Sequence, residues 1–141
     1  MANMFRISEA ASLGMHMMAL LAGSPGRLLT AREAAITLRA SEAHLSKVLQ
    51  RLSRAGLVRS ARGPGGGFTL SRGDITLLEV FEAVEGPLDF SGCLLSRPVC
   101  GKNRCIMGGL IESTNLVVRK YLANTRVSEL AGVYERESDA S

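Results

Sequence analysis

The three cysteines of the chain lie within thirteen residues, in the stretch CLLSRPVCGKNRC that runs from Cys93 through Cys100 to Cys105. An odd, clustered set of cysteines suits metal or redox chemistry in a reducing compartment better than the disulfides of a secreted protein. A tetrahedral zinc site needs a fourth thiolate or imidazole, and the chain offers only His16 and His44, so zinc stays open only with help from a carboxylate. Iron-sulfur clusters are held mainly by thiolates, and a different fourth ligand leaves a labile iron. The stretch therefore favours an iron-sulfur site.

Positive charge is concentrated in one part of the sequence. Residues 27–72 hold nine Arg or Lys and two acids, a local net charge of +7, whereas the whole chain of 141 residues carries +4. This asymmetry predicts a polyanion as the partner of the N-terminal half. A solvated basic face without a partner would show the same composition. The motifs in this stretch, rather than its charge, therefore distinguish the two interpretations.

Length and hydropathy predict one globular domain with a helical extension. No apolar run reaches about 18 residues, so we expect no membrane partner and no membrane span. The first helical stretch has a single Arg before it, and polar residues interrupt its apolar block, which argues against a signal peptide. We expect a cytoplasmic protein.

The first half of the chain predicts a helix-turn-helix. Apolar residues at helical spacing run over 7–22, and Gly and Pro at 23–26 end that helix. Thr30 and Glu33 form a capping-box pattern for a helix over 31–38. A third helix lies between a capping Ser41 and Gly56, with Leu45, Val48, Leu49 and Leu52 as its buried stripe. Two short capped helices with a tight connection are typical of this motif.

The stretch LVRSARGPGGGFTLSR over 57–72 predicts a β-hairpin directly after the helix-turn-helix, which makes it a wing. Its tip, 62–67, carries Arg62 beside Gly63 and Pro64, and the glycines let the backbone approach another surface closely. We expect Arg62 to enter a narrow minor groove. A flexible turn with an incidental arginine is the alternative. A phosphate-binding P-loop is not expected, because no Gly-Lys-Ser/Thr follows.

The second half predicts a short helix over 75–86, a cysteine loop, a longer amphipathic helix over about 107–122 and a last short helix over 127–134. We divide the chain into a DNA-binding domain (1–86), a cluster-binding loop (87–106), dimerisation helices (107–134) and a disordered tail (135–141). The stripe of the long helix is Leu110, Thr114, Val117, Val118, Tyr121 and Leu122. A long helix outside a compact winged-helix unit usually buries its stripe against a partner, so we expect a homodimer. Packing back onto its own domain is the alternative.

The stretches HLSKVLQRLSRAGLVRSARGPGGGFTLSR and ITLLEVFEAVEG, followed by the three cysteines, resemble the IscR/NsrR group of bacterial winged-helix regulators, the Rrf-two family. The resemblance covers nearly the whole chain. It implies a mostly α fold with a small β wing, in a homodimer joined through the C-terminal helices. It also implies binding to near-palindromic double-stranded DNA and an iron-sulfur cluster held in the 93–105 loop.

The DNA contacts follow from the geometry of such domains. Residues near the start of a recognition helix meet base edges in the major groove. Here these are Ser41, Ala43, His44, Ser46 and Lys47. Lys47 and Arg62 are the expected groove contacts, while Arg51 is expected to meet phosphate or solvent, and Arg59 and Arg72 phosphates.

The resemblance also addresses the fourth ligand. In IscR-like members a histidine follows the last cysteine by three residues, where this chain has Gly108. In NsrR-like members a carboxylate near the start of the first helix of the other protomer completes the site, and the alignment places Glu9 of the partner protomer there, with Asp89 as the fallback. Without the resemblance, Glu9 is an acid in a first helical turn, where the helix dipole favours it.

The cysteine spacing departs from the family pattern. Six and four residues separate the cysteines here, whereas the IscR pattern has five and five. The cluster type therefore stays open, with 4Fe-4S favoured and 2Fe-2S possible.

Together these features predict a repressor whose DNA affinity is gated by an iron-sulfur cluster that senses nitric oxide, redox state or iron. One alternative is a cluster-free winged-helix regulator whose cysteines form a thiol/disulfide switch. An alternative of another class is a small iron-sulfur electron carrier. The chain contains no set of nucleophile, base and orienting residue and no catalytic metal motif, so we do not expect an enzyme.

Overall fold

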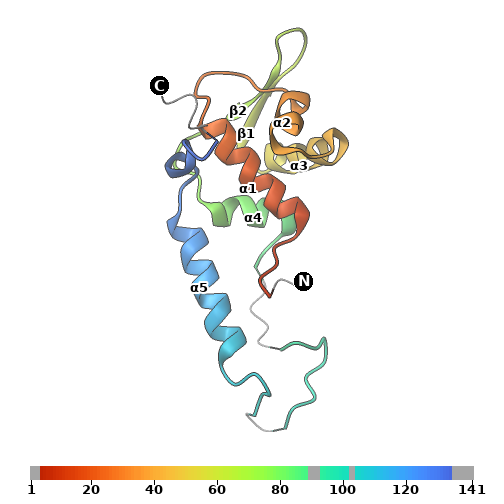
Figure 1. Cartoon of the computed structure of the whole chain (residues 1–141), viewed down its shortest axis with the longest axis vertical. Helices are drawn as coiled ribbons and strands as arrows, with labels where there is room; N and C mark the ends of the chain where they lie inside the picture. The colour runs from red at the N-terminus through yellow and green to blue at the C-terminus, as the bar shows by residue number, and fades with distance from the viewer. Residues whose placement is uncertain (1–3, 89–92, 102–103, 135–141) are drawn as a thin grey trace.

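The computed structural model describes residues 4–88, 93–101 and 104–134. Its elements follow the order α1 (Glu9–Ala22), α2 (Ala31–Leu38), α3 (Glu42–Arg54), β1 (Val58–Ala61), β2 (Gly67–Leu70), α4 (Leu77–Glu85), α5 (Leu110–Asn124) and the 3-10 helix η1 (Val127–Leu130). In Figure 1, α1 to α4 and the hairpin form one body, from which α5 extends toward the cysteine loop. The fold predicted from sequence, mostly α with a small β wing, is confirmed.

The wing is tied to the helix-turn-helix at its base. Strands β1 and β2 pair antiparallel, with Val58 opposite Leu70 and Ala61 opposite Gly67. Beyond this pair, Leu29 forms an antiparallel bridge with Phe68, through N–H to carbonyl bonds of 3.0 and 2.8 Å. Because Leu29 directly precedes the Thr30 cap of α2, the wing and α2 are held to one another.

The core lies where α1 crosses α3 and α4. Met17, Met18 and Leu21 of α1 are buried, as is the whole predicted stripe of α3. Gly14 sits where α1 meets α4, and a Cβ built on it would lie 3.0 Å from Cγ2 of Val84. The absence of that Cβ lets the two helices approach closely.

Helix ends differ from the predictions where local hydrogen bonds decide them. Helix α1 begins at Glu9 because the Ser8 side chain accepts a bond from the N–H of Ala11. Helix α4 begins at Leu77 because Thr76 and Glu79 form a capping box. Helix α5 begins later than predicted, at Leu110, after Gly108 with φ +60°. The predicted helix over 127–134 is only the 3-10 turn η1.

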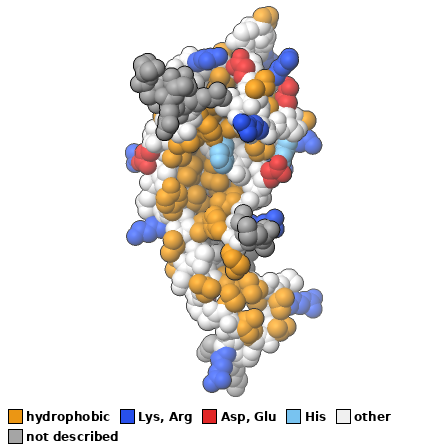
Figure 2. All heavy atoms as spheres, viewed as in Figure 1, with side chains coloured by type: hydrophobic (Ala, Val, Ile, Leu, Met, Phe, Trp, Pro, Cys, Tyr) orange, Lys and Arg blue, Asp and Glu red, His pale blue; other side chains and the backbone are white. Residues whose placement is uncertain are grey.

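Helix α5 leaves most of its apolar stripe uncovered. Only Leu122 of the stripe is buried, whereas Val117 and Tyr121 are 69% and 61% exposed. Figure 2, which has the same view as Figure 1, shows hydrophobic side chains in a band that runs from the middle of the molecule down toward its lower end, the direction in which α5 extends. Among the described residues, no helix is long and apolar enough to cross a membrane. The tail predicted at 135–141 lies outside the described residues.

Candidate nucleic-acid interface and cysteine loop

The recognition helix α3 presents one polar face. Ser41 caps it, accepting a bond of 3.3 Å from the N–H of His44. Its buried stripe fixes the rotation of the helix, so that the residues predicted for base contact are uncovered. Ser41, Ala43 and Lys47 are exposed, and His44 and Ser46 are partly exposed.

The predicted wing residues are also at the surface. Arg59, Arg62, Gly63 and Pro64 are all exposed. Gly63 and Gly65 have φ of +88° and +76°, a left-handed conformation that glycine adopts without steric cost. The glycines therefore shape the tip, as the sequence indicated.

Arg51, predicted to meet phosphate or solvent, and Arg72, predicted to meet phosphate, have partners within the chain. Nη1 of Arg51 donates a bond of 3.0 Å to the carbonyl of Val84, at the end of α4. The Arg72 guanidinium pairs with Asp74 at 3.4 Å and with Glu79. Both side chains remain partly accessible, but their cations are already engaged.

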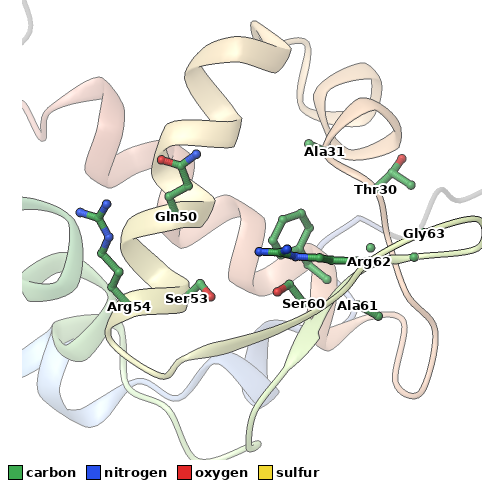
Figure 3. Close-up of a pocket in the computed structure, with 12 residues that line it drawn as sticks. Thr30, Ala31, Gln50, Ser53, Arg54, Ser60, Ala61, Arg62 and Gly63 are labelled. Atoms are coloured by element: carbon green, nitrogen blue, oxygen red, sulfur yellow. The ribbon is translucent and has the colours of Figure 1, made fainter.

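Between α3 and the wing lies a cleft of about 570 Å³ that the sequence did not reveal (Figure 3). Twelve residues line it, and none is acidic: Thr30, Ala31, Gln50, Ser53, Arg54, Ser60, Ala61, Arg62, Gly63, Gly66, Gly67 and Phe68. Figure 3 shows the Arg62 side chain turned away from the hairpin tip and into this cleft, while Arg54 points away from Arg62 at the far edge. The signal available in sequence was the i, i+3 spacing that continues the exposed face from Lys47 to Gln50 and Ser53.

The cysteine loop carries its three thiols free, with Cys100 exposed and Cys93 and Cys105 partly buried. The sulfur of Cys93 accepts the N–H of Leu95 at 3.5 Å, and that of Cys105 accepts the N–H of Met107 at 3.4 Å. Thiol sulfurs with backbone N–H donors are a donor set that fits an iron-sulfur cluster. Within the described part of the chain, however, no three His, Cys, Asp or Glu are grouped as a metal site. Asp89, the fallback ligand, lies outside the described residues.

Glu9 lies close to the recognition helix of its own chain. Its side chain is 82% exposed, and Oε1 is 4.0 Å from Nδ1 of His44. The preceding residue, Ser8, donates its hydroxyl to Glu85 at the end of α4. The first turn of α1 therefore meets both α3 and α4, a proximity that no local pattern reveals.

An apolar groove of about 490 Å³ opens between α1, α5 and η1. Its lining includes Met15, Val117, Tyr121 and Tyr134, and the Tyr134 hydroxyl donates a bond of 3.2 Å to the carbonyl of His16. Burial raises the pKa of Tyr134 above its usual value of 10.0. The groove continues the uncovered stripe of α5.

Fold and surface together define a winged helix-turn-helix protein with exposed basic side chains on α3 and the wing. The family model for Rrf2, described as an iron-dependent transcriptional regulator, matches residues 7–132. The chain belongs to the Rrf2 family: it is a DNA-binding transcriptional regulator and not an enzyme. This membership speaks against the electron carrier that the cysteines alone left open.

Known relatives support the same assignment. The HTH-type transcriptional regulator IscR of Xenorhabdus nematophila is 34% identical over 92 residues, which make up 64% of this chain and 56% of that protein. The match thus spans little more than half the length of that curated relative. The structure of CymR, the global cysteine regulator of B. subtilis, is 28% identical with a TM-score of 0.75, covering 92% of this chain and 98% of that one. The oxidized form of Staphylococcus aureus CymR is 25% identical with a TM-score of 0.70, covering 90% and 96%.

Proposed function

We propose that the chain is a homodimeric repressor whose affinity for near-palindromic DNA is gated by an iron-sulfur cluster. Cys93, Cys100 and Cys105 of one protomer and Glu9 of the partner subunit would hold the cluster, with 4Fe-4S favoured over 2Fe-2S. When bound, such a cluster supplies a group that reacts with nitric oxide or oxygen and is lost in iron shortage. A regulator that binds chromosomal DNA works in the cytoplasm, where we place this one.

The uncovered stripe of α5 supports the dimer. Leu116, Val117 and Tyr121 are each more than 60% exposed on one helix, and the groove beside them is lined almost entirely by apolar side chains. A contiguous apolar surface of this kind usually marks an interface. A second copy of α5 offers a matching surface, because a two-fold interface pairs one patch with itself.

The position of Glu9 is the observation that carries the gating. Its carboxylate lies 4.0 Å from His44 on the recognition helix of its own chain. When the partner's cysteine loop engages the Glu9 carboxylate, that carboxylate moves away from His44. The start of α3 therefore has different surroundings in the cluster-bound and the cluster-free protein. A hundredfold change in DNA affinity between them requires about 2.7 kcal/mol of coupling.

Two further hydrogen bonds connect the first turn of α1, through the end of α4, to the second half of α3. The Ser8 hydroxyl joins the first turn of α1 to Glu85 at the end of α4. One residue earlier in α4, the carbonyl of Val84 accepts the 3.0 Å bond from Arg51 of α3. A shift of the first turn of α1 would therefore also reach the second half of the recognition helix.

The proposal is tested by anaerobic purification and native mass spectrometry of wild type, Glu9→Ala and a control, Glu82→Ala, whose carboxylate is exposed on α4. We expect a dimer with cluster iron and sulfide in wild type and control, and a weakened or smaller cluster in Glu9→Ala. Equal cluster content in all three would contradict the role of Glu9. Bare protein in all three after anaerobic reconstitution would contradict the cluster, and a monomer would contradict the dimer.

A thiol/disulfide switch is the second candidate, favoured by the three free cysteines and by the likeness to CymR, for which an oxidized form has been solved. The two candidates separate on oxidation. A switch predicts that an oxidant forms a disulfide in the bare protein and changes its DNA affinity, and that Glu9→Ala leaves this response unchanged.

A further inference from the structure

We propose that Arg72 is a positioning residue: its ion pair with Glu79 holds the wing to the segment of chain that is also bonded to the end of α5. This inference rests on the DNA-binding function and deepens it, because the pose of the wing decides how the expected groove contact, Arg62, meets the duplex. It replaces the phosphate contact that the sequence predicted for Arg72.

The backbone that leaves the wing is exposed. At the end of β2, the N–H and the hydroxyl of Ser71 both donate to the carbonyl of Leu57, at 3.1 and 3.0 Å. The next three residues, Arg72 to Asp74, are exposed, and a Cβ built on Gly73 would meet nothing within 4 Å. The backbone of this stretch alone therefore leaves the angle between the wing and α4 loosely defined.

The Glu79 carboxylate bridges this exposed stretch. One of its oxygens pairs with the Arg72 guanidinium. The other accepts bonds from the N–H and the hydroxyl of Thr76, at 2.8 and 3.3 Å, which form part of the cap of α4. The same guanidinium pairs with Asp74 at 3.4 Å, which holds it beside the first turn of α4. One carboxylate thus connects the residue that leaves the wing to the helix that follows.

The start of α4 is in turn bonded to the chain just after α5, by an antiparallel bridge. The N–H of Leu77 donates to the carbonyl of Thr125 at 2.9 Å. The N–H of Val127 donates to the carbonyl of Ile75 at 2.8 Å, and both of these side chains are fully buried. Because the bridge is part of the core, a change in the direction of α5 moves the start of α4, and the Arg72–Glu79 pair transmits that movement to the wing.

The first test measures DNA affinity over a range of salt concentrations for wild type, Arg72→Gln, Glu79→Gln and the double variant. The duplex is one that the wild-type protein selects from a random-sequence pool. Glutamine at position 79 keeps the capping box of α4 but loses the ion pair. We expect each single variant to bind roughly fivefold more weakly, about 1 kcal/mol. The double variant should bind no more weakly than either, because both changes remove one interaction, and the salt dependence should stay that of wild type.

A phosphate contact by Arg72 predicts a different pattern. Arg72→Gln would then reduce the slope of log affinity against log salt by about one. Glu79→Gln, which removes a negative charge from the DNA-binding domain, would bind at least as tightly as wild type. Either result would overturn the proposal. The matched control Lys120→Gln/Glu82→Gln removes one exposed charge of each sign and should bind like wild type, and an equal loss in this control would also overturn the proposal.

Hydrogen exchange supplies a second readout that needs no DNA. The amides of Leu29 and Phe68 are bonded where the wing meets the chain before α2, and those of Leu77 and Val127 where α4 meets the end of α5. Loss of the ion pair in Arg72→Gln should speed exchange at Leu29 and Phe68 and leave the other two amides unchanged.

Two exchange results would overturn the proposal: unchanged rates at Leu29 and Phe68, or faster exchange at all four amides, which would indicate a general loss of stability. If the wild type selected no duplex at all, the DNA-binding function itself would fail. The exchange experiment would still show whether Arg72 holds the wing, so the two failures are distinguishable.

Discussion

Replacement of Gly67 by alanine tests how the wing is attached. A Cβ at Gly67 would lie 2.7 Å from O, 2.8 Å from C and 3.1 Å from N of Leu29, all of them backbone atoms, at a φ of +153°. The conformation alone costs on the order of 1 kcal/mol for a residue with a Cβ. Relief of the contact requires the Leu29–Phe68 bridge to open, and its two hydrogen bonds contribute about 1 kcal/mol each.

We therefore expect Gly67→Ala to lower the free energy of unfolding by about 3 kcal/mol, roughly 10 °C in melting temperature for a chain of this size. Two controls separate the causes. Gly65 has φ +76° but nothing within 4 Å of its Cβ position, so Gly65→Ala should lose only about 1 kcal/mol. Gly73 has neither restriction, so Gly73→Ala should change stability by less than about 0.5 kcal/mol.

The assay is urea and thermal unfolding of the four proteins at one protein concentration, because the stability of the proposed dimer would depend on concentration. Equal losses for Gly67→Ala and Gly65→Ala would refute the reasoning, since the contact with Leu29 would then cost nothing. A Gly67→Ala protein that keeps its stability but loses DNA affinity would also refute it, by showing that the wing moves without opening the bridge.

Two further predictions concern stability. Thr76 and Glu79 cap α4 reciprocally, so Thr76→Ala should lower the free energy of unfolding by about 1 kcal/mol in urea unfolding, and an unchanged midpoint would argue against the capping box. Burial raises the pKa of Tyr134 above 10.0, so the unfolded chain releases the phenolic proton at lower pH than the folded chain does. The stability that the Tyr134 phenol contributes is therefore fully present below pH 10, and it is lost as pH rises through the pKa of the folded state. Tyr134→Phe should therefore show a shallower loss of stability between neutral and alkaline pH than wild type, and parallel curves would contradict the burial of this phenol.

Sequence predicted the elements whose signals are local. The stripe of α3 and the Thr30–Glu33 box of α2 follow from spacing alone, and both are confirmed. The Thr76–Glu79 box has the same pattern and was within reach of sequence, although the helix there was predicted only from its apolar residues. Boundaries near glycines, such as the start of α5, were less accurate because a single positive φ decides them.

The long-range contacts could not be predicted. The bond from Arg51 to Val84 spans 33 residues, and the proximity of Glu9 to His44 depends on how α1 crosses α3. The cleft beside the wing is lined by Phe68, which the isolated bridge ties to Leu29, and a bridge of a single residue pair leaves no periodic pattern in the sequence. The position of the cysteine loop could not be predicted either, because no hydrophobic repeat or helix cap defines it.

The Leu29–Phe68 bridge has a consequence for the thermodynamics of DNA recognition. A wing attached on only one side would have to be immobilised along its whole length when it meets the duplex, and each residue fixed costs roughly 1–2 kcal/mol in conformational entropy. Here β2 is bonded to β1 on one side and to the chain before α2 on the other, so the residues left to be ordered are those of the tip, 62–66. The rest of the entropy loss has already occurred during folding, and the heat and entropy of DNA binding should reflect a largely preorganised surface.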